Sequence, residues 1–276
     1  MSLLLANQLL VVLSTDSVAA VRRSRGLGRR IIDQKNVMFP QSIEALKSEL
    51  PNWLQATKQL DSLLAAMQIQ PKIELKVTLA SDFVRYMALP SQPIHMSTTE
   101  KLAYAAAAYR EIYGEVVDDW EIKLNDSPDH QTTIAAAIDK KLLDVFAQIS
   151  LKYQLKLISV QPYLMSAYNC LSSQINKSSG YLAIVEFKRL LLINLERGNC
   201  QNLRTYALGS DWQLELKSLL MRELLVSESS NQEILVYAPV QKNISLNAIE
   251  SWNVRRISTL KNVLSNYHFA MLEVAL

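Results

Sequence analysis

The same order of predicted elements occurs in both halves of the chain. Each half opens with three closely spaced runs rich in Val, Leu and Ile, a pattern typical of β-strands joined by tight turns. A helix, a further strand and another helix then follow. The repeat predicts a duplicated α/β fold in which each half forms its own sheet. The predicted strands lie within the first 40 residues and at 73–79, 181–187, 190–196, 203–208 and 233–239.

A further group of elements interrupts the first half. The segments FVRYMAL (83–89), WEIKL (120–124) and TIAAAI (133–138) are predicted strands. Between the first two, Ser97 and Glu100 have the spacing of a capping box, in which each side chain bonds the other's backbone at the start of a helix. That helix is predicted to run to Tyr113, where Gly114 ends it. We therefore expect an inserted α+β subdomain at about 82–138.

One linker divides the chain. The segment 176–180 (NKSSG) is rich in residues that favour loops, and it predicts a first lobe at 1–177 and a smaller second lobe at 178–276. The remaining predicted strands are 155–160 and 254–257. The predicted helices are 42–67 with a break at Pro51, 139–153, 162–175, 211–226, a short stretch near Ile249 and a terminal helix from Thr259.

Glycine is scarce in this chain. It has 6 glycines in 276 residues, where average usage would give roughly 19. Because glycine lets the backbone adopt positive φ and approach a phosphate closely, loops that cradle a cofactor are not expected. A net charge of +3 argues against a dedicated nucleic-acid binder. The 49% share of hydrophobic residues argues against a disordered chain.

No residue pattern predicts a metal site or a catalytic centre. The histidines and cysteines lack the spacing of metal ligands, and the two cysteines are interpreted as reduced thiols. These residues are His95, His130, His268, Cys170 and Cys200. The apolar run at 3–13 has no positive charge before it and is too short to span a bilayer, so we interpret it as a buried strand. The sequence thus predicts a cytoplasmic protein with no catalytic residues, no metal and no cofactor.

Five arginines gather within nine residues, RRSRGLGRR, at a predicted hairpin tip. They are Arg22, Arg23, Arg25, Arg29 and Arg30. Three interpretations stay open. The cluster is a solvated tip, a surface that docks on anionic lipid or an acidic partner, or a nucleic-acid contact. The last is the weakest, because no aromatic residues are interleaved with the arginines.

Four segments and a hairpin carry a resemblance to a known group. The segments are FVRYMALP, YREIYGEVVDDWEIKL, TIAAAIDKKLLDVF and LKLISVQPYLMSAYN, and the hairpin is GYLAIVEFKRLLLINLERGNCQNLRTYAL. They resemble the PilM/GspL/MshI-like actin-like proteins of bacterial type IV pilus and type II secretion assemblies, most specifically at 82–212. The resemblance implies a duplicated RNase H-like (actin-like ATPase) fold, with two lobes of mixed β-sheets flanked by helices.

The resemblance also indicates where nucleotide contacts would lie. Each lobe of an actin-like ATPase offers an Asp-x-Gly hairpin to the phosphates. In this chain the first acidic position falls on Val11 or Val12, and Asp16 follows one turn later, where a capping role in the turn is the simpler interpretation. In the second hairpin Glu186 replaces the Asp, but Lys188 occupies the glycine position. The strand at 233–239 is not followed by the glycine pair expected near adenine.

These departures predict a fold that has lost its nucleotide chemistry. We expect a non-catalytic cytoplasmic scaffold, peripheral to the inner membrane, that binds the cytoplasmic tail of a single-pass pilus or secretion protein. By resemblance, the tail would dock around residues 75–125. Nucleic acid is not an expected partner, and the sequence leaves a homodimer open. The alternative is a divergent ATPase or sugar-kinase-like enzyme of the same fold.

Overall fold

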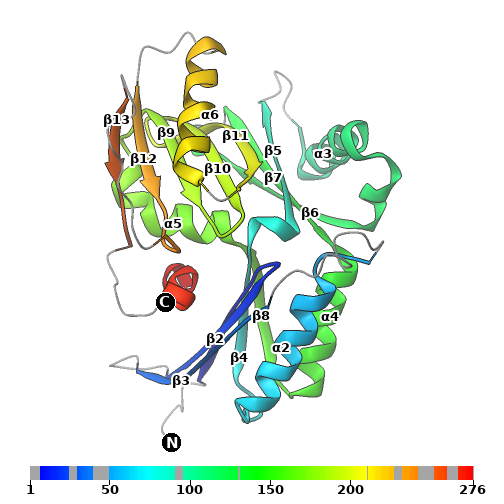
Figure 1. Cartoon of the computed structure of the whole chain (residues 1–276). Helices are drawn as coiled ribbons and strands as arrows, with labels where there is room; N and C mark the ends of the chain where they lie inside the picture. The colour runs from blue at the N-terminus through cyan, green and yellow to red at the C-terminus, as the bar shows by residue number, and fades with distance from the viewer. Residues whose placement is uncertain are drawn as a thin grey trace, which may run out of the picture.

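Two five-stranded sheets with the same strand arrangement form the framework of the molecule (Figure 1). In each sheet the three consecutive strands at one edge are antiparallel, and the following two are parallel. The duplicated α/β fold predicted from the sequence is therefore confirmed. The computed structural model describes residues 7–24, 30–39, 50–90, 96–129, 131–209, 211–226, 232–241, 252–259 and 267–275.

The first sheet has the order β3-β2-β1-β4-β8 and the second the order β11-β10-β9-β12-β13. The strands of the first are β1 (Gln8–Leu13), β2 (Ser17–Arg23), β3 (Ile31–Met38), β4 (Glu74–Leu79) and β8 (Lys156–Pro162). Those of the second are β9 (Gly180–Val185), β10 (Arg189–Glu196), β11 (Asn199–Ala207), β12 (Glu233–Tyr237) and β13 (Asn253–Arg256). In both sheets the central strand is fully buried, because it carries an unbroken apolar run.

A third, antiparallel sheet is inserted between β4 and β8 along the chain. Its order is β5-β7-β6, from β5 (Val84–Pro90), β6 (Trp120–Asp126) and β7 (Thr132–Asp139). Helix α3 (Thr98–Tyr113) and the short helix η2 (Gly114–Asp119) pack on one face of it around the buried Tyr109. The limits of the two lobes and of the inserted subdomain stay a prediction.

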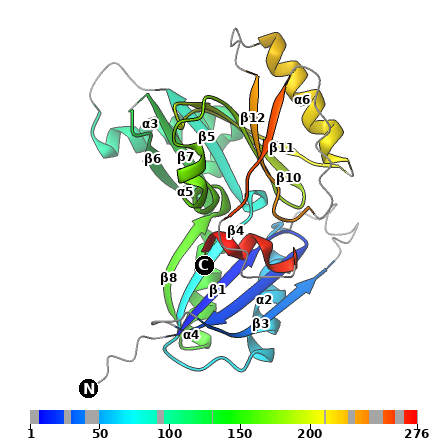
Figure 2. The same ribbon diagram turned by 90° about the vertical axis from the view of Figure 1, so that its left-hand side faces the viewer.

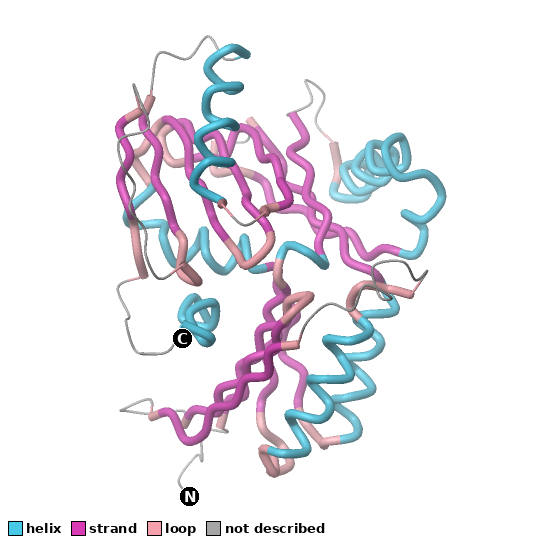
Figure 3. The backbone as a smooth tube through the Cα atoms, in the orientation of Figure 1, coloured by secondary structure: helices cyan, strands magenta, loops and turns pink. Residues whose placement is uncertain are grey.

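Helices cover both outer faces of the assembly (Figures 2 and 3). On the first sheet these are α2 (Leu54–Ala66) and α4 (Lys140–Lys152), and on the second it is α6 (Trp212–Val226). Between the two sheets lie α5 (Tyr163–Ile175) and the C-terminal helix η3 (Tyr267–Ala275). No helix among the described residues is both long and apolar enough to cross a membrane.

One apolar cluster joins the two lobes. It takes Leu10 and Val12 from the first sheet and Leu182 and Ile184 from the second. Helix α5 contributes Ala167 and Leu171, and η3 contributes Phe269 and Leu272. All eight side chains are buried, so this cluster contributes hydrophobic stabilisation that depends on both lobes at once.

Most of the predicted elements are confirmed, and two differ. Strand β11 begins at Asn199 rather than at 203, because the tight turn through Gly198 leads directly back into pairing with β10. The terminal helix is described only from Tyr267 and is a 3-10 helix. The predicted break at Pro51 is confirmed, since helix α2 begins at Leu54. The first part of the predicted helix 42–67 and the stretch near Ile249 lie outside the described residues.

The residues at the two ends of α3 determine where this helix starts and ends. The Ser97 hydroxyl accepts a hydrogen bond from the Glu100 backbone N–H, and the Glu100 carboxylate accepts one from the Ser97 N–H at 2.8 Å. At the other end Gly114 has a φ of 72°, which an L-residue adopts only with strain. The predicted capping box is therefore confirmed.

Replacing Ser97 with Ala should lower the free energy of unfolding by about 1 kcal/mol, because an orphan N–H of the first helical turn loses its acceptor. Chemical denaturation monitored by far-UV circular dichroism measures the change. Ser62→Ala is the matched control, since Ser62 lies within α2 and its hydroxyl only bonds the carbonyl of Lys58. An equal loss in both variants would contradict the capping role.

Candidate functional site between the lobes

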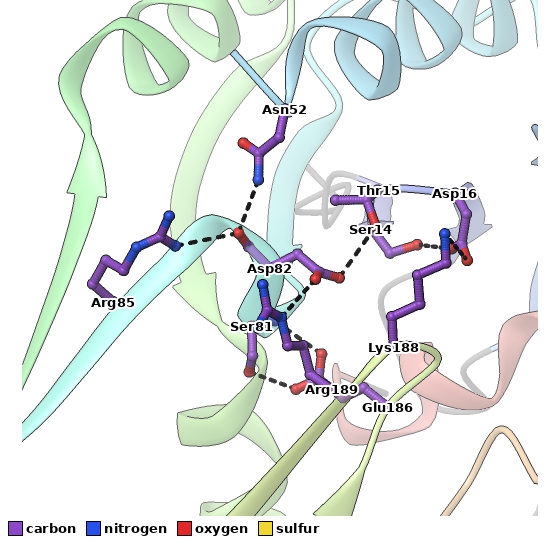
Figure 4. A network of polar contacts seen from close by, with 10 residues as sticks. All are labelled: Ser14, Thr15, Asp16, Asn52, Ser81, Asp82, Arg85, Glu186, Lys188 and Arg189. Atoms are coloured by element: carbon purple, nitrogen blue, oxygen red, sulfur yellow. Dashed lines mark hydrogen bonds and ion pairs between the residues drawn. The ribbon is translucent and has the colours of Figure 1, made fainter. Parts of the chain in front are cut away.

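Three connecting segments meet between the two sheets, and their polar side chains form one network (Figure 4). The β1–β2 turn supplies Ser14, Thr15 and Asp16. The short helix η1 (Ser81–Phe83), which follows β4, supplies Ser81 and Asp82. The β9–β10 turn supplies Glu186, Lys188 and Arg189. Two of these turns are the hairpins at which the sequence resemblance places phosphate contacts.

Glu186 is deeply buried in the network, with 1% of its surface exposed. Its carboxyl group accepts a hydrogen bond from the Ser81 backbone N–H at 2.9 Å and one from the Ser81 hydroxyl at 2.5 Å. Burial raises the pKa of Glu186 to about 8, against the lowering effect of these two bonds. The second lobe thus inserts a carboxyl group into the first and fixes it there.

Asp82 forms the second link between the lobes. The Arg189 Nε lies 2.9 Å from the Asp82 Oδ1, and the Asp82 side chain is 8% exposed. The Thr15 hydroxyl donates to the other carboxylate oxygen at 3.3 Å. Asp82 is therefore a buried carboxylate whose charge is compensated by a cation from the opposite lobe.

The backbone around Asp82 is fixed from the first lobe and the inserted sheet. Its carbonyl accepts hydrogen bonds from the Asn52 side-chain amide at 3.1 Å and from the Arg85 guanidinium at 3.4 Å. Asn52 lies just before α2, and Arg85 belongs to β5. These contacts hold η1 at the junction of the first sheet, α2 and the inserted sheet.

Lys188 forms the third link, which is looser. Its Nζ lies 3.6 Å from the Asp16 Oδ2, and 40% of the Lys188 side chain is exposed. The expectation that Asp16 caps its turn is wrong. The Ser14 hydroxyl accepts the Ser17 N–H at 3.0 Å, and Asp16 accepts from the Ser14 hydroxyl. A serine at this position reaches the backbone N–H three residues on, which leaves the Asp16 carboxylate facing Lys188 (Figure 4).

The two hairpin turns present charged side chains to each other. A phosphate-binding hairpin presents backbone N–H groups with no side chain in front of them. Here the side chains of Lys188 and Asp16 face each other across the two turns, and Glu186 is bonded to Ser81. Val11 and Val12 are buried within β1. Among the described residues no three His, Cys, Asp or Glu side chains are grouped so as to hold a metal ion, and His95 and His130 lie outside those residues.

The arginine cluster is not a single exposed surface. Arg23 is 7% exposed, and its guanidinium donates to the Gln8 side-chain oxygen at 2.9 and 3.1 Å. The pairing of β1 with β2 places Gln8 directly opposite Arg23, which is why this arginine is buried. Including Arg23 in a partner-facing cluster was therefore wrong. Arg22 is half-buried and Arg30 is exposed, while Arg25 and Arg29 lie outside the described residues.

Sequence reasoning missed Ser81, Asp82 and Arg189. The segment ASDF at 80–83 follows a buried strand and precedes another, so an acidic residue within it implies a buried carboxylate in need of a cation. The sequence therefore contains a signal for Asp82. The cation itself lies 107 residues away along the chain, and no local pattern connects the two.

The architecture is similar to that of several solved protein structures. No family model matches the sequence, and no curated protein matches it. Solved structures do match. A protein of Bacteroides thetaiotaomicron with an actin-like ATPase fold matches with a TM-score of 0.61 and 13% identity, over 98% of this chain and 96% of that one. The chain has the actin-like ATPase fold.

Two further structures with this similarity come from secretion and pilus assemblies. The cytoplasmic domain of EpsL, an inner-membrane component of the type II secretion system of Vibrio cholerae, matches with a TM-score of 0.58 and 13% identity, over 98% of this chain and 94% of that one. A chain of the PilM–PilN type IV pilus biogenesis complex matches with a TM-score of 0.60 and 11% identity, over 91% and 88%. In this actin-like fold, the Glu186–Ser81, Arg189–Asp82 and Lys188–Asp16 contacts join the two lobes.

Proposed function

We propose that this chain is a non-catalytic adaptor of a type IV pilus or type II secretion assembly, peripheral to the inner membrane. Its role is to bind the cytoplasmic tail of a single-pass membrane protein. The similarity to the cytoplasmic domain of EpsL and to the PilM–PilN complex, both over most of the chain, supports this setting.

The observation that carries the non-catalytic part is the contact of Lys188 with Asp16. In a nucleotide-binding actin-like protein, the two hairpin turns leave room for phosphate between them. Here the Lys188 ammonium group lies 3.6 Å from the Asp16 carboxylate of the opposite turn, which supports a loss of that room. The Glu186–Ser81 and Arg189–Asp82 contacts hold the β9–β10 turn against η1.

Mg-ATP should leave the melting temperature unchanged. A ligand at 100 times its Kd would add about 2.7 kcal/mol of stability, which a thermal shift assay detects easily. A flat response at millimolar Mg-ATP is the expected result, because the described turns offer no phosphate cradle. A rise that depends on ATP concentration would instead support the divergent ATPase or kinase-like alternative.

The tail peptide should bind in the region of residues 75–125. In the structure this region comprises β4, η1, β5, α3, η2 and β6, so it spans the first sheet and the inserted sheet. Fluorescence anisotropy with the labelled N-terminal peptide of the membrane protein encoded beside this chain measures the affinity, and a scrambled peptide is the control. Binding at micromolar concentration is expected. Equal binding of both peptides, or of neither, would contradict the adaptor function.

A further inference from the structure

Helix α6 has two apolar faces, of which only one is used within the described structure. Its inner face packs Trp212, Leu216 and Leu220 against the second sheet. Its outer face carries Leu214, Met221 and Leu225, which are 63%, 41% and 88% exposed. Figure 2 shows the helix along the outer side of the second lobe. A surface helix of a monomeric protein normally shows one apolar stripe.

The exposed residues form a continuous stripe. Leu214, Ser218, Met221 and Leu225 are spaced by four, three and four residues, which places them along one line of an α-helix. Ser218 is exposed and is the only small residue among them. Scattered surface leucines need no explanation, but a stripe over three turns of one helix is typical of a helix that pairs with another.

We propose that this stripe joins two copies of the chain about a two-fold axis, with their α6 helices antiparallel. In this register Leu214 of one copy faces Leu225 of the second, and Met221 of one faces Ser218 of the second. The large Met221 side chain of each copy therefore packs against the small Ser218 side chain of the other. A parallel pair would instead place Ser218 against Ser218 and leave a gap between the two leucine layers.

Charges beside the stripe match the same arrangement. Glu215 and Arg222 lie on one flank of the stripe, seven residues apart, toward opposite ends of the helix. A two-fold axis between antiparallel helices brings the same flank of both copies together, so Glu215 of each copy faces Arg222 of the other. The stripe is therefore complementary to itself in shape and in charge, which favours a second copy as its occupant. The small net charge of +3 adds little repulsion between copies.

The expected dimer is weak. A helix of 15 residues is about 22 Å long, and a single pair of such helices buries less than the roughly 1,200 Å² of a stable interface. The two copies would pair effectively when both are held at one membrane-bound assembly, because tethering raises their effective concentration.

Sedimentation velocity of the purified chain tests the dimer at concentrations up to about 1 mM, the range set by a weak interface. Reversible dimerisation is expected. Leu214→Glu and Leu225→Glu should each weaken it at least about tenfold, since each change occurs twice at the interface. Leu151→Glu is the matched control, because Leu151 is 79% exposed on α4, away from the stripe. A monomer at every concentration, or an equal effect of Leu151→Glu, would overturn the proposal.

Cysteine crosslinking tests the direction of the helices. After mild oxidation, a mixture of the Leu214→Cys and Leu225→Cys proteins should give a covalent dimer, whereas each protein alone should give no more than the parent chain with its native Cys170 and Cys200. Equal melting temperatures will show that the exposed substitutions leave the fold intact. Strong crosslinking of either variant by itself would indicate parallel helices and would overturn the antiparallel arrangement.

Discussion

The stability of this protein should fall as the pH rises toward 8, and Glu186→Gln should remove that part of the fall. Burial raises the pKa of Glu186 to about 8 in the folded state, whereas an exposed glutamate has a value of 4.5. Between these two values the folded state holds a proton that the unfolded state has lost. The stabilisation is therefore complete below the unfolded pKa and is lost as the pH rises through the folded pKa.

The size of the effect follows from the same linkage. One titrating group changes the free energy of unfolding by at most about 1.4 kcal/mol for each pH unit, so a loss of roughly 3 kcal/mol is expected between pH 5 and pH 8. Urea denaturation at a series of pH values measures it. Because other groups also titrate, the relevant quantity is the difference between the parent chain and Glu186→Gln at each pH. Gln keeps an acceptor for the Ser81 N–H and carries no charge.

Two results would distinguish the effect of the Glu186 charge on stability from the effect of its hydrogen bonds with Ser81. Glu186→Ala should cost about 2–3 kcal/mol even at pH 5, because the buried Ser81 N–H and hydroxyl both lose their partner. If the parent chain and Glu186→Gln changed in parallel with pH, the Ser81 bonds and the nearby Arg189 would be enough to keep the carboxylate ionised in the fold.

Local patterns in the sequence determine most of the elements of this fold. The spacing of Ser97 and Glu100 predicts the start of α3, and Gly114 predicts its end, because both are decided by backbone groups within a few residues. The repeated order of strands and helices predicts two similar sheets for the same reason. Each sheet follows from periodicity and turns, which are local properties.

The candidate site depends on contacts that local patterns do not contain. Glu186 and Lys188 were selected through the resemblance, but Ser81 is 105 residues from Glu186 and its role appears only when the lobes are assembled. The burial of Arg23 likewise depends on the register of β1 with β2, which sets Gln8 opposite it. Prediction failed where the partner of a polar side chain belongs to a different strand or lobe.

Arg189→Met should destabilise the protein by about 2 kcal/mol, far more than the same change at the neighbouring Lys188. Removing Arg189 takes away the ion-pair partner of the buried Asp82 carboxylate, and a buried charge that loses its partner is costly. The expected loss lies below the roughly 3–5 kcal/mol typical of fully buried pairs, because the Arg189 side chain is 32% exposed. Lys188→Met should cost under about 1 kcal/mol, since its 3.6 Å pair with Asp16 is looser and more exposed.

The double variant Asp82→Asn with Arg189→Met distinguishes charge compensation from lost packing. If the cost of Arg189→Met comes from the unpaired carboxylate, the neutral amide introduced by Asp82→Asn should recover most of it, since an amide oxygen can still accept from the Thr15 hydroxyl. Denaturation of the parent, both single variants and the double variant forms a complete thermodynamic cycle, and a coupling of about 1–2 kcal/mol is expected. Simple addition of the two single losses would show that Arg189 acts through packing alone. A large coupling would establish that the ion pair between η1 and the β9–β10 turn stabilises the contact between the two lobes.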